Sequence, residues 1–491
     1  MSFLLAIDQG TSSSRAVVYD DALQTLASAQ QEFPQIYPKP GWVEHDPEAI
    51  WESVRHVTGQ CVDELGVTDF AGIGITNQRE TTLIWNRASG ACVYNAVVWQ
   101  DRRTADLCER LRADGAGQMV VDKTGLRLDP YFSATKIAWL LQNVPGVRDD
   151  ANAGKLAFGT VDTFLLWRMT GGRVHATDAT NASRTMLFNI HTQDWDDELL
   201  QLFDVPRELL PDVHDCAAEF GVSDADAIGI EAPVLGIAGD QQAALIGQAG
   251  FGQGMTKSTY GTGCFVIANT GSDALTSKNQ LLTTIASRLD GEVTYGLEGS
   301  VFVAGSAVQW LRDGLKIVDS APETEAIAAQ TGIVEDVHVV PAFAGLGAPY
   351  WDAHARGAIL GLTRGSGLAE IVTATLQAIA YQTHDLIAAM SDDGVSPSVI
   401  RVDGGMVAND WFLQFLADIL AVTVERPANV ESTVLGAACL AGLKADMIAS
   451  TSDISAMWQR ERLFEPGMSR ERREELLAGW SAAVARVRTD A

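Results

Sequence analysis

Short runs of apolar residues, each followed by a polar or glycine-rich turn, recur along this chain. Residues 3–7 (FLLAI) and 16–19 (AVVY) are apolar, and the segment between them is rich in Gly, Ser and Thr. This pattern predicts two buried strands joined by a tight hairpin. Further apolar runs at 71–76 and 96–99 alternate with helical periodicity such as that of 47–65. The alternation predicts an α/β layer fold with ligand sites at the strand ends.

A glycine-dense segment divides the chain near its middle. Residues 247–254 (GQAGFGQG) interrupt a helical pattern that starts at Asp240, which predicts a hinge or a domain boundary. The length of 491 residues also exceeds what one hydrophobic core usually organises. We therefore expect an N-terminal domain over residues 1–247 and a C-terminal domain over residues 248–491.

The second half of the chain opens with a pattern that repeats the start of the first. Residues 256–269 (TKSTYGTGCFVIAN) again predict a strand, a Gly/Thr turn and a strand, as residues 3–19 do. The repeat suggests two related halves, although it is too short to establish a duplication. Later elements are predicted as strands at 338–341 and 399–402, helices at 366–385 and 409–420, and a charged helical tail over 460–488.

The charge of the chain limits the partners that it can bind. Hydrophobic residues make up 47% and charged residues 20%, as in ordinary globular proteins. The formal net charge of −28 repels polyanions, so we expect neither nucleic acid nor an anionic membrane as a partner. A ligand that carries phosphate must be held against this field by backbone amides, a metal ion or a few placed cations.

The cysteines and the N-terminus indicate a cytoplasmic protein. The six cysteines are far apart and form neither a CxxC pair nor a Cys/His cluster, so we expect free thiols rather than a zinc site or disulfides. The N-terminal apolar run has no basic flank or cleavage site, and no stretch of the sequence reaches membrane-spanning length.

The turn after the first predicted strand is a candidate phosphate site. Residues 8–15 (DQGTSSSR) offer backbone amides and hydroxyls to phosphate oxygens, and Asp8 stands where it can hold a hydrated Mg²⁺. The alternative is an ordinary hairpin turn rich in Ser and Thr. The chain has no GxxxxGK[ST] loop, which excludes a Walker-type kinase.

Two further strand ends carry candidate chemistry. Residues 236–242 (GIAGDQQ) place Asp240 at a helix start, where it is either a helix N-cap or the general base for an attacking hydroxyl. Residues 403–409 (DGGMVAN) form a glycine turn that lets a nucleotide approach the backbone. A single such turn is common, but glycine-rich strand ends recur at Thr262 and Gly305.

The order and length of these motifs resemble those of the FGGY carbohydrate kinase family over most of the chain. The segments that carry the resemblance are DQGTSSSR (8–15), GWVEHDP (41–47), GITNQRETT (74–82), VVWQDRRT (97–104), YFSATKIAWLLQN (131–143), TDATNASRTMLFNI (177–190), GIAGDQQAALIGQ (236–248) and RVDGGMVAND (401–410). The resemblance implies two ribonuclease H-like (actin-like ATPase) domains with an interdomain cleft. It also implies Mg-ATP-dependent phosphorylation of a small polyol, with glycerol as the expected substrate and sn-glycerol 3-phosphate as the product.

The resemblance assigns roles to individual residues. Asp240 is implied as the catalytic base. The implied polyol ligands are Arg79, Glu80, Tyr131, Asp240 and Gln241, with Trp99 and Phe265 as apolar walls. The implied ATP ligands are Thr11, Ser12, Ser13 and Arg15 in the first phosphate turn, Thr262 in the second, and Gly305, Gln309, Gly405 and Asn409 in the nucleotide pocket. Asp8 and Asp240 are implied to orient Mg²⁺ through its waters.

Simpler interpretations of several of these residues remain open at this stage. Arg79 and Glu80 could form a surface ion pair, and Tyr131 could be a rim aromatic. Arg15 could pair with a neighbouring acid instead of lying near the transferred charge.

Other functions also remain open. A sister kinase for a pentulose, a tetritol or a gluconate would share the phosphate machinery and differ in the polyol pocket. An actin- or Hsp70-like ATPase switch would share the architecture alone. The resemblance further implies a homodimer or a homotetramer.

One departure from the family pattern concerns regulation. Related bacterial enzymes often have a Gly-rich, Arg-bearing loop before the GIAGDQQ segment, and this loop binds a sugar bisphosphate inhibitor. Residues 226–233 (DAIGIEAP) lack both features here, and Glu231 would repel a phosphate. We therefore expect no inhibition by fructose 1,6-bisphosphate. A steady-state assay that finds inhibition at a physiological concentration would refute this expectation.

Overall fold

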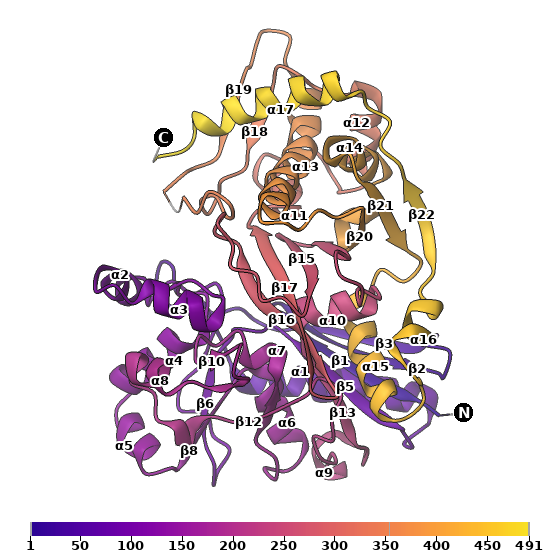
Figure 1. The fold of residues 1–491 in the computed structure, drawn as a ribbon. Helices are drawn as coiled ribbons and strands as arrows, with labels where there is room; N and C mark the ends of the chain where they lie inside the picture. The colour runs from indigo at the N-terminus through magenta and orange to yellow at the C-terminus, as the bar shows by residue number, and fades with distance from the viewer. Residues whose placement is uncertain (1, 353, 490–491) are drawn as a thin grey trace.

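The computed structural model describes residues 2–352 and 354–489, and its first half is built around a mixed sheet of five strands (Figure 1). The strands are, in spatial order, β13 (Val234–Gly239), β5 (Gly72–Asn77), β1 (Leu4–Gln9), β2 (Ser13–Tyr19) and β3 (Thr25–Glu32). β1 is antiparallel to β2 and parallel to β5, which is parallel to β13. The hairpin predicted over residues 3–19 is therefore confirmed.

The second half contains a sheet of seven strands. In spatial order they are β16 (Leu282–Leu289), β17 (Glu292–Val301), β15 (Cys264–Gly271), β14 (Thr256–Tyr260), β20 (Val399–Asp403), β21 (Thr423–Pro427) and β22 (Arg460–Phe464). β17-β15-β14-β20-β21 have the same order and relative directions as β3-β2-β1-β5-β13. The strand pair predicted over 256–269 is confirmed, and the likeness of the two halves extends to a whole ribonuclease H-like sheet in each.

Helices and short strand pairs surround both sheets. The helices of the first half are α1 (Pro47–Leu65), α2 (Ala105–Ala113), α3 (Gly117–Thr124), α4 (Ser133–Asn143), α5 (Val147–Asn152), α6 (Val161–Met169), α7 (Ala179–Ala182), α8 (Asp197–Phe203), α9 (Ala225–Ile228) and α10 (Asp240–Gly247). Those of the second half are α11 (Gly305–Gln309), α12 (Glu323–Thr331), α13 (Leu368–Asp392), α14 (Asp410–Leu420), α15 (Ser432–Lys444), α16 (Thr451–Met457) and α17 (Arg470–Ala485). The short strand pairs are β4 (Glu44–His45) with β7 (Ala96–Val97), β6 (Leu83–Asn86) with β8 (Leu156–Gly159), β9 (Ala176–Asp178) with β12 (Asp212–His214), β10 (Phe188–Asn189) with β11 (Asp194–Trp195), and β18 (His338–Val340) with β19 (Ala358–Leu360). Single helical turns are η1 (Arg207–Leu209), η2 (Trp310–Gly314) and η3 (Gly405–Ala408).

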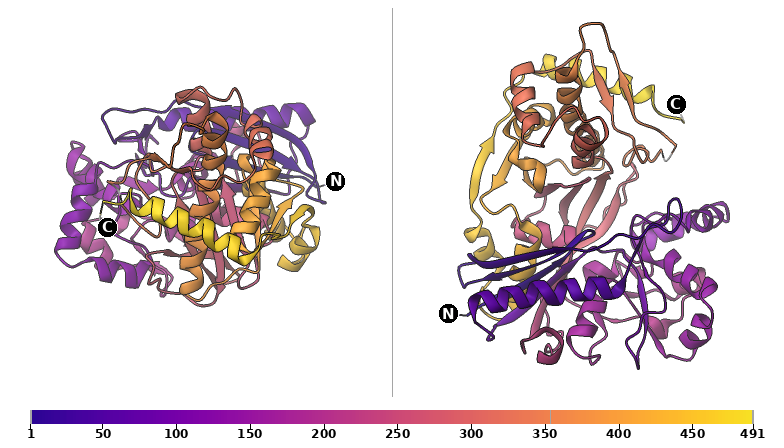
Figure 2. Two further views of the ribbon diagram at one scale, coloured as in Figure 1. Left: turned by 90° about the horizontal axis from the view of Figure 1, so that it is seen from above. Right: turned by 180° about the vertical axis from the view of Figure 1, so that it is seen from behind.

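Helix α1 has the bounds that its periodicity predicts. The Asp46 side chain accepts a hydrogen bond from the backbone N–H of Glu48, and Pro47 occupies the first turn, where it costs no hydrogen bond. Gly66 ends the helix with a φ of 64°, a conformation that glycine adopts without strain. The buried face, which includes Ile50 and Val54, packs on β2 and β3 and covers one face of the first sheet (Figure 2).

The opposite face of the first sheet is covered by α15, which comes from the second half of the chain (Figures 1 and 2). Glycines in the sheet allow this close approach, because a Cβ at Gly74 would lie 2.1 Å from the Ala437 carbonyl oxygen. Likewise, a Cβ at Gly436 would lie 1.8 Å from the Ala243 carbonyl oxygen where α15 meets α10. The boundary between residues 247 and 248 thus remains a prediction, and the second half contributes a helix to the first sheet.

The structure corrects the prediction for the charged tail over 460–488. Its first residues form the edge strand β22, and only residues 470–485 are helical. β22 pairs with β21, and ion pairs join Arg460 to Glu425 (2.9 Å) and Glu461 to Arg426 (2.6 Å) across the two strands. An exposed edge strand and a solvated helix can have the same charged composition. Only the pairing with a neighbouring strand distinguishes the two.

The remaining predicted elements need smaller adjustments. The helix predicted at 366–385 runs from Leu368 to Asp392 as α13, and the strand predicted at 399–402 is β20. The six cysteines are free thiols, and all except Cys92 are buried. Within residues 2–352 and 354–489, no helix combines the length and apolarity that crossing a membrane requires.

Candidate active site

The parallel strands of the first sheet bring three predicted site segments to one edge. Gln9, Asn77 and Gly239 end β1, β5 and β13, and they are aligned as register partners in the sheet. The segments that follow them are the 10–15 turn, residues 78–80 and Asp240. Since ligands of open α/β sheets bind beyond the carboxyl ends of parallel strands, this edge is the expected site.

The second sheet brings its glycine turns together in the same way. β14 and β20 are parallel, with Thr259 opposite Asp403. Gly404 follows β20 with a φ of 90°, and a Cβ there would lie 2.6 Å from the Tyr260 carbonyl oxygen. The N–H of Gly305 donates to the carbonyl of Gly261 (2.9 Å). The turn that contains Thr262 therefore lies beside the turns that contain Gly305 and Gly405.

Arg79 and Glu80 are buried, so the interpretation as a surface ion pair is wrong. Arg79 is 1% and Glu80 2% exposed. Arg79 Nε lies 3.0 Å from Asp240 Oδ1, and Arg79 Nη1 donates to Glu298 Oε2 (2.6 Å). Glu80 Oε1 accepts from Arg184 Nε (2.8 Å), and Arg184 Nη2 donates to Glu298 Oε1 (2.9 Å). These five side chains form a cluster of cations and anions in which Glu298 and Arg184 hold Arg79 and Glu80 in place.

Asp240 occupies the first position of α10, and Gly239 is the N-cap, so the N-cap interpretation of Asp240 is wrong. Its Oδ1 accepts a hydrogen bond from the N–H of Gln241 (2.7 Å). Burial raises the pKa of the Asp240 carboxyl, and Glu80 adds to the rise, whereas Arg79 and Lys257 oppose it. The side chain is nevertheless 32% exposed, so its carboxylate can be reached from outside the protein.

Asp8 on β1 and Asp240 at the start of α10 lie near enough for their charges to interact. Burial raises the pKa of Asp8 to about 7, the charge of Asp240 adds to this rise, and Arg15 opposes it. Two carboxylates that repel each other in this way fit a divalent cation between them. In the part of the chain that the structure describes, no three His, Cys, Asp or Glu side chains form a ready-made metal site. Such a pair suits Mg²⁺, which keeps most of its waters.

Three aromatic side chains line the site from both domains. The Trp99 ring packs edge-on against Tyr131 (centroids 5.6 Å apart) and against Phe265 on β15 (6.2 Å). Trp99 Nε1 also donates to Thr11 Oγ1 (2.9 Å), which links the aromatic wall to the first turn. The Tyr131 hydroxyl faces Arg79 Nη2 at 3.4 Å, so Tyr131 belongs to the cluster rather than to an outer rim.

The 10–15 turn has its own protein partners. Ser13 Oγ accepts from Gln30 Nε2 (2.9 Å), and the Ser12 carbonyl accepts from the N–H of Phe33 (3.2 Å). Arg15 forms an ion pair with Glu431, a residue from the second half. Arg15 therefore does form the salt bridge to an acid that was considered as an alternative. Its role beside the transferred charge remains a prediction.

The predicted nucleotide ligands of the second half lie at helix ends. Gln309 is exposed at the end of α11. Asn409 is the N-cap of α14, where its Oδ1 accepts from the N–H of Phe412 (2.8 Å). Asn409 therefore has a structural role whether or not it also contacts a nucleotide.

A test of the nucleotide pocket uses the two adjacent glycines. A Cβ at Gly405 meets no atom within 4 Å, so we expect Gly405→Ala to fold normally and to raise the KM for ATP by about tenfold or more, because the methyl group enters the space of the nucleotide. Gly404→Ala is the contrast, and strain at its φ of 90° should lower the free energy of unfolding by about 1–3 kcal/mol. An unchanged KM for ATP in Gly405→Ala would remove Gly405 from the pocket.

Four charged residues of the site were missed from the sequence, namely Lys136, Arg184, Lys257 and Glu298. Arg184 and Lys136 lie inside segments 177–190 and 131–143, which carry the family resemblance. The sequence analysis named these segments but gave the two residues no role. Glu298 and Lys257 lie in strands β17 and β14. For Glu298 the available signal was a carboxylate between Leu297 and Gly299 inside a predicted strand, because such a charge needs a buried partner, whereas the polar sequence of β14 (TKSTY) gave no such signal for Lys257.

Lys136 holds the backbone next to the charged cluster of Arg79, Glu80, Asp240, Arg184 and Glu298, which is called the polyol cluster below. Its Nζ donates to the carbonyls of Glu80 (2.9 Å) and Tyr131 (2.7 Å). Burial lowers the pKa of Lys136 to about 7, although the charges of Glu80, Asp101 and Asp129 oppose this. The backbones of two predicted polyol ligands are thus held by one buried amine.

The low pKa of Lys136 predicts a pH dependence of stability. The unfolded chain, with a lysine pKa near about 10.4, binds more protons than the folded chain above about pH 7, so stability rises with pH there. We expect the free energy of unfolding of the wild type, relative to Lys136→Met, to rise by up to about 1.4 kcal/mol per pH unit. Urea titrations between about pH 7 and 9 measure it, with Lys155→Met, at an exposed lysine, as the control. A difference that does not vary with pH would contradict the expectation.

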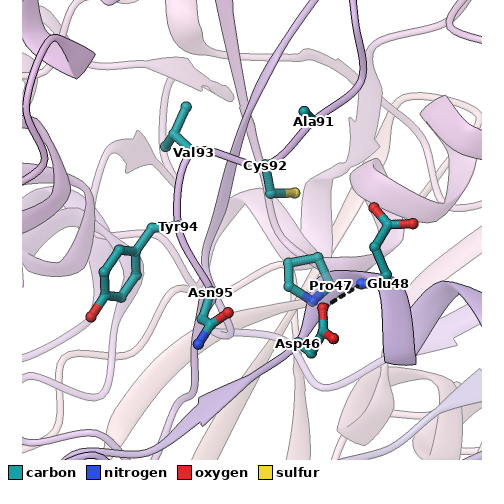
Figure 3. A pocket seen from close by; sticks show the side chains of 8 residues that line it. All are labelled: Asp46, Pro47, Glu48, Ala91, Cys92, Val93, Tyr94 and Asn95. Atoms are coloured by element: carbon teal, nitrogen blue, oxygen red, sulfur yellow. Dashed lines mark hydrogen bonds between the residues drawn. The ribbon is translucent and has the colours of Figure 1, made fainter.

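A surface pocket of about 490 Å³ lies apart from these residues (Figure 3). It is lined by Asp46, Pro47, Glu48 and residues 91–95. Its polar groups already have protein partners, because Asp46 caps α1 and the Tyr94 hydroxyl donates to Glu44 (2.9 Å). The pocket contains none of the predicted site residues.

Paired ribonuclease H-like domains, with acidic side chains at facing strand ends, define the class of phosphotransferases and ATPases built on this architecture. Comparison with known families narrows the class. Residues 3–247 match the N-terminal domain and residues 256–445 the C-terminal domain of the FGGY family of carbohydrate kinases. The chain belongs to the FGGY family of carbohydrate kinases.

Individual relatives are similar over the full length. The chain is 62% identical over 491 residues to glycerol kinase 1 of Pseudomonas aeruginosa, covering 100% of this chain and 99% of that protein. It is 59% identical over 490 residues to a glycerol kinase of Rhodospirillum centenum, covering 99% and 98%. The crystal structure of Plasmodium falciparum glycerol kinase with ADP superimposes with a TM-score of 0.93 at 37% identity, covering 99% of this chain and 98% of that chain.

Proposed function

We propose that the chain is a glycerol kinase, an ATP:glycerol 3-phosphotransferase that converts glycerol and ATP to sn-glycerol 3-phosphate and ADP. The observation that carries this proposal is the position of Asp240. Its partly exposed carboxylate lies 3.0 Å from Arg79 Nε and near enough to Asp8, beside the first turn, for the two charges to interact. An acceptor hydroxyl and a terminal phosphate can therefore meet at one carboxylate. The full-length similarity to glycerol kinases supports the choice of substrate.

The polyol is held by charged and aromatic groups. Arg79 supplies hydrogen-bond donors, and Glu80 and Asp240 supply acceptors. Each hydroxyl of a triol can therefore both accept and donate a hydrogen bond. Trp99 and Phe265, whose ring centroids are 6.2 Å apart, pack against its carbon chain. Because Phe265 belongs to the second sheet, a polyol in this position contacts both domains.

The phosphates of ATP are held by the two turns. The 10–15 turn, with Thr11, Ser12 and Ser13, and the turn at Thr262 present backbone N–H groups, while Gly305 and Gly405 leave space for the nucleotide beside the backbone. Asp8 and Asp240 would hold Mg²⁺ through its waters. Mg²⁺, when bound, neutralises charge on the phosphate oxygens.

The proton of the attacking hydroxyl passes to Asp240. Arg79 stays buried and charged and keeps the carboxylate oriented toward the polyol. The backbone N–H of Gln241 fixes the same oxygen at 2.7 Å. Contact between the domains at Trp99 and Phe265 excludes water, which would otherwise compete with the polyol for the phosphoryl group.

The test is the product formed from MgATP and glycerol. Detection of sn-glycerol 3-phosphate by enantioselective chromatography supports both the reaction and the position of attack. A panel of glycerol, erythritol, xylulose and gluconate tests the substrate, and a preference of about tenfold or more for another member would replace glycerol. ATP turnover that does not depend on any polyol would favour an ATPase switch instead.

We further propose that the enzyme works in the cytoplasm as a homodimer or a homotetramer. Six free thiols suit a reducing compartment. Light scattering on the purified chain gives the oligomeric state.

A further inference from the structure

Lys257 is a buried cation that reaches the polyol site from the second domain. It lies on β14 and is 0% exposed. Its Nζ donates to Gln241 Oε1 (2.5 Å) and to Thr259 Oγ1 (2.8 Å). Gln241 lies on α10, directly after Asp240, so this hydrogen bond joins the second sheet to a predicted polyol ligand.

The surroundings of Lys257 act on its pKa in opposite directions. Burial lowers the pKa of its ammonium group, but Asp403 on β20 and Asp240 on α10 oppose this, with Glu298 on β17 adding to their effect and Arg79 acting against it. Three carboxylates thus lie near the ammonium group, each on a different element. The two hydrogen bonds that Nζ donates, to Gln241 Oε1 and to Thr259 Oγ1, are those that an ammonium group makes.

The charge of Lys257 decides how the Gln241 amide is oriented. An ammonium group has donors and no acceptor, so only the amide oxygen can face it. The amide nitrogen Nε2 must then point away from Lys257. Among the residues that the structure describes, Nε2 of Gln241 has no hydrogen-bond acceptor, although the residue is only 7% exposed. Nε2 is not fully enclosed by protein, so an oxygen atom of a ligand can reach it and accept its hydrogen bond.

We propose that Lys257 is a positioning residue that determines specificity, because it holds the Gln241 amide with Nε2 as a donor toward a hydroxyl oxygen of the polyol. This inference rests on the proposed function. A hydroxyl that accepts from Gln241 keeps its own proton free to donate to a carboxylate such as Asp240. A flipped amide would present an oxygen instead and would compete for that proton. Lys257 thereby selects the orientation in which the substrate hydroxyl binds.

A double-mutant cycle tests this proposal. The variants are Lys257→Met, Gln241→Ala and the pair, with glycerol KM, kcat and calorimetric glycerol affinity as readouts. We expect Lys257→Met to raise the KM and the Kd for glycerol by about 10- to 100-fold, the usual range for a lost hydrogen bond in a charged network, and to change kcat by less than about threefold. In the Gln241→Ala background the same substitution should change KM by less than about twofold.

Controls separate this role from a merely structural one. Lys123→Met removes an ion-paired lysine on α3, away from the site, and should leave the KM for glycerol unchanged. If Lys257→Met does not fold, Lys257→Gln replaces it in the cycle, because a neutral amide no longer dictates which end of Gln241 it meets. An unchanged KM in the Lys257 variant, or an equal rise in both backgrounds, overturns the proposal.

Failure of the proposed function gives a different result. If the wild type prefers another polyol, glycerol is not the substrate. The double-mutant cycle is then run on the preferred polyol. The role of Lys257 still requires that its substitution raises KM, and that this rise disappears in the Gln241→Ala background. If the wild type binds no polyol in calorimetry, the positioning role falls together with the proposed function.

Discussion

Asp240→Asn is expected to lower kcat for glycerol phosphorylation by roughly 10²–10⁴-fold, the usual effect of losing a general base. Asparagine has the same shape but cannot accept the proton of the attacking hydroxyl. Arg79 keeps its bonds to Glu298 (2.6 and 3.1 Å) in this variant, so the polyol cluster should stay assembled. Steady-state and single-turnover assays measure the loss.

The control for Asp240→Asn is the same change at Asp226, an exposed residue of α9. This variant should have normal kcat. The affinity of Asp240→Asn for glycerol, measured by calorimetry, should fall far less than kcat, because the loss concerns the transition state. A kcat near that of the wild type would remove Asp240 from the role of base.

Glu298→Gln is expected to lower the free energy of unfolding by about 3–5 kcal/mol, the usual cost of breaking a buried ion pair. Burial alone would raise the pKa of Glu298, but Arg184 and Arg79 outweigh it and lower this pKa to about 2. Without this carboxylate, two buried guanidinium groups face each other with less compensating charge. Because Arg79 then loses its fixed position beside Asp240, we also expect kcat/KM for glycerol to fall.

The sign of the pH effect distinguishes charge from packing. A glutamate has a pKa of about 4.3 in the unfolded chain, so Glu298 contributes its stability above that pH and loses it as the pH falls toward about 2. The stability difference between the wild type and Glu298→Gln should therefore shrink below about pH 4. Glu292→Gln, at the exposed start of the same strand, should show almost no difference. A difference that is constant with pH would mean that the loss comes from packing.

Local patterns predicted the elements that present the site. The hairpin over 3–19 and the strand pair over 256–269 were predicted because strand periodicity and turn chemistry act over a few residues. The parallel alignment that places Asp240 beside the 10–15 turn was not predictable from these runs alone. The resemblance to the family supplied that alignment, and the register of β1, β5 and β13 explains it.

Local sequence patterns could not predict the buried charged residues that hold the site residues in place. All seven residues from Tyr295 to Val301 of β17 are buried, so no alternation marks which side chain faces the cluster. Glu298 finds Arg79 and Arg184 only after residues more than 100 positions away in the chain have assembled around it. Lys257 is similar, since its partner Gln241 lies in another domain. Long-range pairs of this kind need the tertiary structure.

The position of α15 has a consequence for biosynthesis. Leu4, Ala6, Val17 and Leu235 form an apolar surface that Val434, Ala437 and neighbouring α15 residues cover. A ribosome delivers those residues after nearly nine tenths of the chain, so the nascent N-terminal half carries an open hydrophobic face throughout most of its translation. A truncated product that ends near residue 247 would keep that face for its whole lifetime, and it should depend on chaperones or precipitate.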